Sequence, residues 1–367
     1  AYAIAMCSKR IAYYECGNGE NNLGFHTGEG MTSLYTQNDN GQFIDGFWPT
    51  VDYYRMPGTT IDTKPLQPGA GGEFGDAVPR RSTWVGGAGL AGESGAVGMD
   101  VEGILAPLTG RKSWFCLGDH IVALGAGITD TSDATVETIV ENRNLHADGA
   151  NVLVLDGEEQ PAEPGWEVRR PVRWAHLDGV AGYVLGRGTT LSAKREERTG
   201  RWRDVNSAGS VDPVTRRWLT MWIDHGSGPE NAAYSYIIAP RASRDATRRL
   251  AEGSEIRVLS NTSELQAVKA RRLDTIAANF WARGRLGHVR VSAPCSILIR
   301  ERDRQLTVAV ADPTQLRSGI SVTILRSGYR NWVADDTITV RSAGPLIRFD
   351  VDTAGAAGST HTVTFLR

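Results

Sequence analysis

Short runs of apolar residues recur along the chain, many alternating with polar residues and bounded by Gly, Pro or Asp. Alternation over about four to eight residues is typical of a half-buried β-strand. Residues 135–143 (TVETIVENR) show this pattern, and residues 114–128 hold two β-like runs around the turn Gly118-Asp119. The pattern predicts a large sandwich of antiparallel sheets, with further strands at 151–155, 172–176, 182–185, 218–225 and 234–239.

Two segments depart from the strand pattern. Residues 241–254 follow Pro240 and carry the best helix signal of the chain. The Gly-rich segment 69–98 is the least regular part, and we expect a long surface loop or flap there. It lacks the GxGxxG spacing after a strand, so the sequence does not support a dinucleotide site.

The pattern of apolar and polar residues changes near residue 278. From there, short strands are expected at regular spacing, as in a second and smaller β-sandwich. The polar stretch 269–274 precedes this change. We therefore predict an all-β chain with a large antiparallel β-sandwich domain over residues 1–275 and a small C-terminal β-sandwich over residues 276–367.

The composition argues against some classes of function. A chain of 367 residues suggests two or three domains, and 42 glycines suit a protein with many turns. The formal net charge of -2 gives no broad positive field, which argues against a nucleic-acid partner. No apolar run approaches the roughly 18 residues that span a bilayer, so we expect no membrane segment.

The cysteines and the start of the chain add two expectations. Cys7, Cys16, Cys116 and Cys295 include no CxxC pair, which argues against a zinc site. A disulfide from Cys16 to Cys7 or to Cys116 stays open, but buried free thiols are favoured. The chain begins AYAIAM, without an initiating Met or a signal peptide, so we expect a processing or cleavage point before Ala1.

The densest polar cluster lies near the start of the chain. Glu15, Asn18, Glu20, Asn21 and Asn22 place two carboxylates and three amides within residues 15–22. Such groups are costly to bury unpaired, so the cluster is a hydrogen-bond network or a site. Asn can bind a sugar hydroxyl or a carboxylate. From the residues alone, a surface turn is the stronger interpretation, because Asn and Gly are common in turns.

This segment and those after it closely resemble polysaccharide lyase family 8, which contains the hyaluronate, chondroitin AC and xanthan lyases. The resemblance implies an N-terminal α/α toroid, a central β-sandwich and a small C-terminal β domain, of which this chain matches the last two. The toroid's motifs do not occur in it. The matching runs stand in the family's order over almost the whole chain: RIAYYE..NGEN, TGEGM..LY, FWPTVD..RMPGTT, KSWFCLGDHIVALGAGI, VETIVENR, RWAHLDGVAGYV, DHGSGPENAAYSYIIAP and LQAV…AANFW.

The resemblance also implies a reaction. Such enzymes cleave an acidic polysaccharide, here expected to be hyaluronan or chondroitin, with xanthan as the alternative. A base removes the C5 proton of a uronic acid and the 4-O-glycosidic bond breaks, which leaves a 4,5-unsaturated product. A Tyr serves as base and then as acid, while hydrogen-bond donors neutralise the uronic carboxylate. The catalytic Tyr, His and Asn would lie on the toroid, as a partner domain or chain.

By resemblance, two residues of this chain are expected to be catalytic. Glu15 would orient the toroid's Tyr and an Arg through a charge-assisted pair, and Asn18 would reach the substrate. Glu20 and Asn21 are candidate substrate-binding residues that fix the loop. His26 is expected to be structural, since the family's catalytic His lies on the toroid.

The remaining expectations concern metal, location and an alternative class. The reaction requires no cofactor or metal, although Asp52 and Asp62 are candidate ligands for a structural Ca²⁺ such as some members of the family hold. We expect a secreted, extracellular protein. The alternative from another class is a non-catalytic carbohydrate-binding or structural β module, which would bind sugar without forming an unsaturated product.

Overall fold

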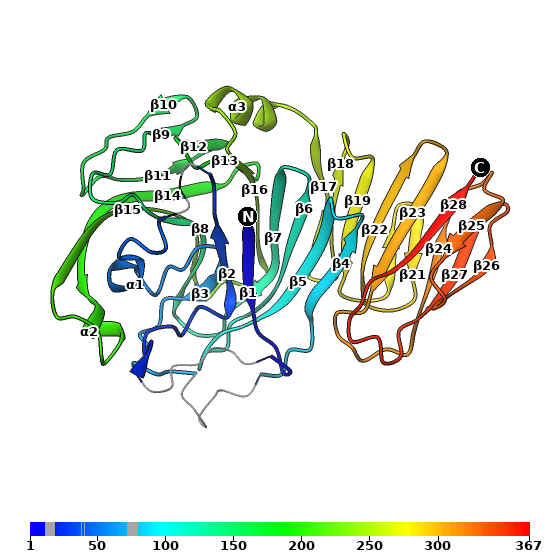
Figure 1. Cartoon of the computed structure of the whole chain (residues 1–367), viewed down its shortest axis with the longest axis horizontal. Coiled ribbons are helices and arrows are strands. Elements are labelled where there is room, and N and C mark those ends of the chain that lie inside the picture. The colour runs from blue at the N-terminus through cyan, green and yellow to red at the C-terminus, as the bar shows by residue number, and fades with distance from the viewer. Residues whose placement is uncertain (12–18, 38, 40, 72–79) are drawn as a thin grey trace. The chain divides into compact units, whose positions relative to one another are not determined.

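The computed structural model describes residues 1–11, 19–37, 39, 41–71 and 80–367. Strands far outnumber helices among them (Figure 1), which confirms the predicted all-β class. The chain divides into two compact units. Unit 1 comprises residues 1–82, 101–110 and 128–252, and unit 2 comprises residues 83–100, 111–127 and 253–367. The predicted domain boundary after residue 275 stays a prediction.

The described residues of unit 1 form antiparallel strands and three short helices. Strands β11-β14-β15-β8-β3 form a five-stranded sheet, β10-β9-β12-β13-β16 are neighbours in that order, and β1 pairs with β2. The helices are α1 (Phe47–Thr50), α2 (Trp202–Val205) and α3 (Arg244–Glu252). The strands are β1 (Tyr2–Met6), β2 (Glu29–Leu34), β3 (Thr60–Asp62), β8 (Thr135–Asn144), β9 (Leu153–Leu155), β10 (Glu158–Glu159), β11 (Glu167–Pro171), β12 (Trp174–Leu177), β13 (Ala181–Leu185), β14 (Thr190–Arg201), β15 (Pro213–Ser227) and β16 (Ala232–Pro240).

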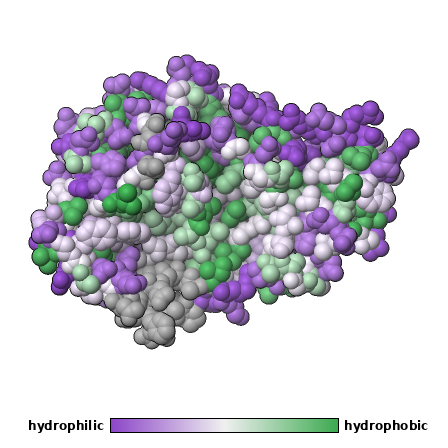
Figure 2. Space-filling model, in the orientation of Figure 1, coloured by the Kyte–Doolittle hydropathy of each residue, from purple (hydrophilic) through white to green (hydrophobic). Residues whose placement is uncertain are grey.

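Helix α3 is the helix predicted at 241–254, and it begins three residues later than expected. It packs on β12 and β13. Gly182 of β13 makes this close approach possible, because a Cβ there would overlap the side chain of Thr247. The other side of α3 faces solvent, and the surface over this helix is hydrophilic (Figure 2).

Strand β8 differs from its prediction in one respect. The alternating sequence predicts one buried and one exposed face, yet every residue after Thr135 is buried. The strand lies between β15 and β3 inside the five-stranded sheet. Its charged residues Glu137, Glu141 and Arg143 are therefore buried as well. Partners from other segments compensate these charges, as described below.

Unit 2 contains the C-terminal sandwich and an antiparallel group in the order β7-β6-β5-β4. The sandwich has a seven-stranded sheet, β17-β18-β19-β22-β23-β28-β25, and a five-stranded sheet, β20-β21-β24-β27-β26. The strands that lie wholly or mostly in unit 2 are β4 (Val85–Leu90), β5 (Ser94–Glu102), β6 (Thr109–Leu117), β7 (His120–Thr129), β17 (Ile256–Asn261), β18 (Leu265–Ala270), β19 (Thr275–Phe280), β20 (Gly284–Leu286), β21 (Val289–Val291), β22 (Cys295–Arg302), β23 (Gln305–Ala311), β24 (Gly319–Ile324), β25 (Asn331–Ala334), β26 (Ile338–Ser342), β27 (Ile347–Asp352) and β28 (His361–Leu366).

The core of the C-terminal sandwich follows from the alternation in these strands. In β27, the residues Ile347, Phe349 and Val351 are at most 1% exposed, and the residues between them point to the other face. The inward residues of both sheets form one apolar cluster, which also contains Val308 and Phe365. The predicted second, smaller β-sandwich is confirmed, and its seven-stranded sheet begins with β17, ahead of residue 278.

The expectation of a surface loop over residues 69–98 is wrong for its C-terminal part, where β4 and β5 form a hairpin. Residues 72–79 of this segment lie outside the described residues. Glycine here permits close packing instead of a loop. A Cβ on Gly87 would overlap the carbonyl of Ala96, and one on Gly98 would lie 2.8 Å from Nε1 of Trp84 and 2.9 Å from a ring carbon of Trp281.

Gly87 and Gly89 provide a matched test of this packing. Both lie in β4, but an added Cβ at Gly89 has only one neighbour, the Ser94 carbonyl oxygen at 4.0 Å. We expect Gly87→Ala to lower the free energy of unfolding by about 1–3 kcal/mol, as overpacking does. Gly89→Ala should change it by less than about 0.5 kcal/mol. Urea unfolding of the two variants measures the difference, and equal effects would contradict the steric explanation.

Candidate functional site

The structure describes two of the four residues predicted as site residues. Glu15 and Asn18 lie outside the described residues, so their catalytic roles stay predictions. Glu20 is exposed and Asn21 is half-buried. They are neighbours in the turn that follows Gly19, and this turn is the described part of the candidate site.

Backbone hydrogen bonds fix the turn on two sides. The carbonyl of Gly19 accepts a bond of 2.9 Å from the Ser207 N–H, and the Asn22 N–H donates to the Val205 carbonyl at 3.4 Å. The Asn22 carbonyl accepts from the Gly69 N–H at 2.7 Å. Gly19 has a φ of 70°, in the left-handed region where glycine is favoured. The turn is thereby held against the end of α2.

Asn21 stabilises the turn with the carbonyl oxygen of its side-chain amide. Its Oδ1 accepts a hydrogen bond of 3.1 Å from the Leu23 N–H, which is the geometry of an Asx turn. Its Nδ2 has no hydrogen-bond partner among the described residues. Asn21 can therefore hold the turn and donate to a ligand at the same time. Glu20 likewise makes no side-chain bond within the described part of the chain.

Aromatic side chains pack in the core below this part of unit 1. Phe25 and Phe47 are buried, and Trp48, Tyr54 and Trp202 are half-buried at the margin of the same cluster. The rings of Phe25 and Tyr54 lie 5.1 Å apart, as do those of Phe47 and Trp48. The two half-buried indoles thus contribute to the core of unit 1 while part of each ring stays accessible.

Buried charges lie just beyond the turn in the sequence. His26 and Glu29 are 1% and 4% exposed, and the His26 Nδ1 lies 2.6 Å from Oε2 of Glu29. Nη2 of Arg80 lies 3.6 Å from Oε1 of the same carboxylate. The pairing gives Nδ1 of His26 a partner, and the structural role of His26 stays a prediction. Burial, followed by the charge of Glu29, raises the pKa of Asp62 to about 6.

A second pair, which the sequence analysis did not identify, joins Arg55, between α1 and β3, to Glu137 of β8. Nε and Nη2 of Arg55 donate to the two oxygens of Glu137 at 2.8 and 2.9 Å. The guanidinium also lies 4.3 Å from the ring centre of Trp222, a cation–π contact. The only sequence signal was a carboxylate within an apolar strand pattern, which does not reveal its partner.

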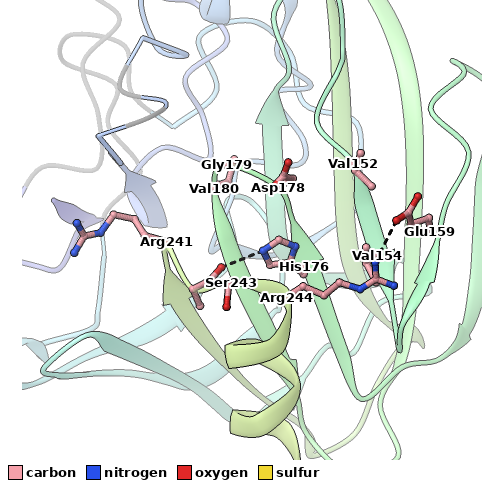
Figure 3. Close-up of a pocket in the computed structure, with 11 residues that line it drawn as sticks. Val152, Val154, Glu159, His176, Asp178, Gly179, Val180, Arg241, Ser243 and Arg244 are labelled. Atoms are coloured by element: carbon pink, nitrogen blue, oxygen red, sulfur yellow. Dashed lines mark hydrogen bonds and ion pairs between the residues drawn. The ribbon is translucent and has the colours of Figure 1, made fainter.

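A hollow of unit 1 lies away from this turn, where α3 meets β9 and β12 (Figure 3). Its volume is about 420 Å³. Nε2 of His176 lies 3.0 Å from the Ala242 carbonyl, and Arg244 pairs with Glu159 at 3.1 Å. Burial lowers the pKa of His176. The lining contains none of the predicted site residues.

The described residues provide no set of ligands for the predicted metal ion. Within the described ranges, no group of three or more His, Cys, Asp or Glu side chains is arranged to hold a metal ion. Oδ1 of Asp52 already accepts a bond of 3.0 Å from the Tyr54 N–H. A Ca²⁺ at Asp52 and Asp62 therefore stays a prediction. Cys7, Cys116 and Cys295 are free thiols, as favoured, and Cys16 lies outside the described residues.

Comparisons with known proteins agree on one family. Residues 1–251 match the model described as polysaccharide lyase family 8, super-sandwich domain, and residues 257–321 match that family's C-terminal beta-sandwich domain. The hyaluronate lyase of Thermasporomyces composti is 42% identical over 98% of this chain and 46% of its own length. The xanthan lyase of Bacillus sp. (strain GL1) is 38% identical over 100% of this chain and 40% of its own length.

A solved structure gives the same result. The X-ray structure of the Streptomyces coelicolor A3 chondroitin AC lyase in complex with chondroitin sulphate has a TM-score of 0.91 and 40% identity. It covers 100% of this chain, which in turn covers 47% of that one. This chain thus spans about half the length of the relatives it matches. Among the described residues, no helix is long and apolar enough to cross a membrane.

The Asx turn of Asn21 is testable by stability alone. Asn21→Ala removes the acceptor for the Leu23 N–H and should lower the free energy of unfolding by about 1 kcal/mol. Asn21→Asp keeps an acceptor at that place and should change it by less than about 0.5 kcal/mol. Thermal unfolding of both variants measures this, and equal losses would contradict the turn as drawn.

Asp62 predicts a pH dependence of stability. Because its folded pKa is about 6, the folded protein retains a proton that the unfolded chain releases near pH 4. The free energy of unfolding should therefore be highest near pH 4, where the carboxyl is protonated in the folded protein. It should fall by up to about 3 kcal/mol as the pH rises through about 6. With chelator present, Asp62→Asn should raise Tm relative to the parent protein near pH 8 and leave it unchanged near pH 4. A pH-independent difference would contradict the assignment.

Proposed function

Because the chain belongs to polysaccharide lyase family 8, we propose that it forms the β-sandwich part of an enzyme that cleaves hyaluronan or chondroitin by β-elimination. The observation that carries the proposal is the match of residues 1–251 to the family's super-sandwich domain. The product would be a 4,5-unsaturated uronic acid at the new non-reducing end.

The reaction needs groups beyond those of this chain. Removal of the C5 proton requires a base, and the glycosidic oxygen requires an acid as it leaves. We assign these steps to the Tyr, His and Asn of an α/α toroid, on the same or a separate polypeptide. The partial coverage of the relatives supports such a further part of the enzyme.

In this scheme the chain provides the β wall of the substrate cleft. Glu15 would hold the toroid's Arg and orient its Tyr, while Asn18 would bind the substrate. Glu20 and Asn21 would support them from the turn, where Nδ2 of Asn21 is available to a sugar hydroxyl. The hydrogen bonds from Ser207 and Gly69 keep this turn in place, so that its polar groups need no reorganisation on binding.

Xanthan is the alternative substrate, because a xanthan lyase is 38% identical over the whole chain. A non-catalytic carbohydrate-binding module is the alternative from another class. It would bind acidic polysaccharide without forming unsaturated product, so product formation separates the two. We also propose that the protein is secreted, since a long anionic polymer does not cross a membrane to reach an internal enzyme.

The assembled enzyme tests the proposal through Glu15. If Glu15 positions the base, Glu15→Ala should lower kcat by about 100-fold or more, as loss of a preorganised charge does, and change Tm by only a few degrees. The ultraviolet absorbance of the unsaturated product measures turnover. Glu163→Ala is the matched control, because it removes an exposed carboxylate of unit 1 that is not among the predicted site residues, and it should retain most of the activity.

Equal losses of turnover and Tm in Glu15→Ala would indicate a structural network and contradict the positioning role. If the parent protein binds polysaccharide but forms no unsaturated product when a toroid is supplied, the module hypothesis replaces the lyase.

A further inference from the structure

Three arginines stand in one row across the five-stranded sheet of the C-terminal sandwich. The register places Arg285 of β20 opposite Arg290 of β21, Arg290 opposite Thr323 of β24, and Thr323 opposite Arg348 of β27. Strands β21, β24 and β27 lie side by side (Figure 1). We call Arg285, Arg290, Thr323 and Arg348 the arginine row.

The row lies on the outer face of the sheet. In β21 the flanking residues Val289 and Val291 belong to the buried core, so Arg290 points away from it. The same alternation holds for Arg348 between Ile347 and Phe349. All three arginines are exposed. Neighbouring strands are about 4.8 Å apart, so Arg348 stands about 10 Å from Arg290, across β24.

The positive charges of the row are not neutralised within the protein. Within the described part of the chain, no carboxylate pairs with Arg285, Arg290 or Arg348. Arg285 only donates from Nε to the Gly287 carbonyl at 2.6 Å, which leaves its other N–H groups free for a ligand. Like charges directly opposite each other on a sheet are destabilising, so the arrangement favours a bound anion.

The acidic group two residues along β27 does not relieve this charge. Asp350 shares the outer face with Arg348, but its carboxylate is already occupied. Oδ2 accepts from Nε of Arg341 at 2.8 Å, and Oδ1 accepts from the Ser321 hydroxyl at 2.6 Å.

A hollow of about 180 Å³ adjoins the row. Besides the row, its lining consists of His288, Val289, Leu325 and Leu346 and contains no Asp or Glu. Leu325 is 52% exposed, an apolar surface against which the C–H face of a sugar ring could pack. Burial is the main cause that lowers the pKa of His288.

We propose that the arginine row binds the carboxylate or sulfate groups of an acidic polysaccharide and anchors the polymer to the C-terminal sandwich. Guanidinium groups donate two parallel hydrogen bonds to such anions. The hollow is smaller than the roughly 300 Å³ of a typical small-molecule pocket, which suits a few groups of a chain that runs across the sheet. The choice of polysaccharide as the anion rests on the proposed function. The overall charge of -2 disfavours nucleic acid.

The test measures binding without turnover, on the full chain. Chondroitin sulfate and hyaluronan oligosaccharides are the probes, and calorimetry at low salt gives Kd. In the double variant Arg290→Gln/Arg348→Gln, we expect affinity to fall at least about tenfold, since two charge-assisted contacts are lost. Tm should stay the same or rise, because repulsion within the row is relieved.

The matched control is Arg257→Gln/Arg330→Gln, which removes the same charge from two exposed arginines of unit 2. Arg257 lies on β17 and Arg330 just precedes β25, both strands of the seven-stranded sheet. We expect its affinity to remain within about twofold of the parent. In the parent protein alone, the oligosaccharide should also slow hydrogen exchange of residues 284–291.

Three outcomes would overturn the anchor: equal affinity of the row variant and the parent, equal losses in row variant and control, or binding of inorganic sulfate as tight as that of the oligosaccharides. None of them bears on the lyase proposal, which depends on product formation and on Glu15. Conversely, if no unsaturated product forms but the row still binds the oligosaccharides, the row is an anionic-polysaccharide site on a non-catalytic protein.

Discussion

The fold of unit 1 depends on compensating the charges buried in strand β8. Arg143 is completely buried, where an unpaired charge would cost about 3–5 kcal/mol. Nη2 donates to Glu141 at 3.1 Å and Nη1 to Asp39 at 3.3 Å, while the Tyr183 hydroxyl donates to Glu141 at 2.6 Å. Burial alone lowers the pKa of Arg143, but the surrounding negative groups outweigh it and raise the pKa. The guanidinium therefore stays charged.

This compensation ties distant segments of the chain to the sheet. Asp39 also lies 3.2 Å from His146, whose other ring nitrogen lies 2.6 Å from Asp45. Arg55 reaches Glu137 in the same strand. Asp39 and Arg55, on either side of α1 in the sequence, thereby connect this part of the chain to β8. Apolar packing and ion pairing together determine how these segments lie on the sheet.

The sequence predicted the positions of strands better than it predicted their burial and the partners of their side chains. Apolar runs and turn residues located β6, β7 and most strands of the C-terminal sandwich after residue 278, whereas β17, β18, β19 and β25 were not predicted. The pattern failed for β4 and β5, where glycine marks close packing, and for β8, where polar positions are buried. Which residues pair across strands depends on register, and register is a property of the folded sheet.

The same limit applies to the candidate site. The polar cluster of residues 15–22 was visible in the sequence, but roles for Glu15 and Asn18 came only from the family resemblance. The structure adds the acceptor role of Asn21, which depends on the backbone of Leu23. The arginine row was invisible beforehand, since its members are up to 63 positions apart along the chain, from Arg285 to Arg348.

The position of Arg285 has a further consequence for association between molecules. Strand β20 is an edge of its sheet, and exposed edges invite pairing with another chain. This edge is only three residues long, Gly284–Leu286, and has a cation at its centre. Two copies approaching through β20 would bring like charges together over very few hydrogen bonds. The edge thus protects the sandwich from growing into a continuous intermolecular sheet.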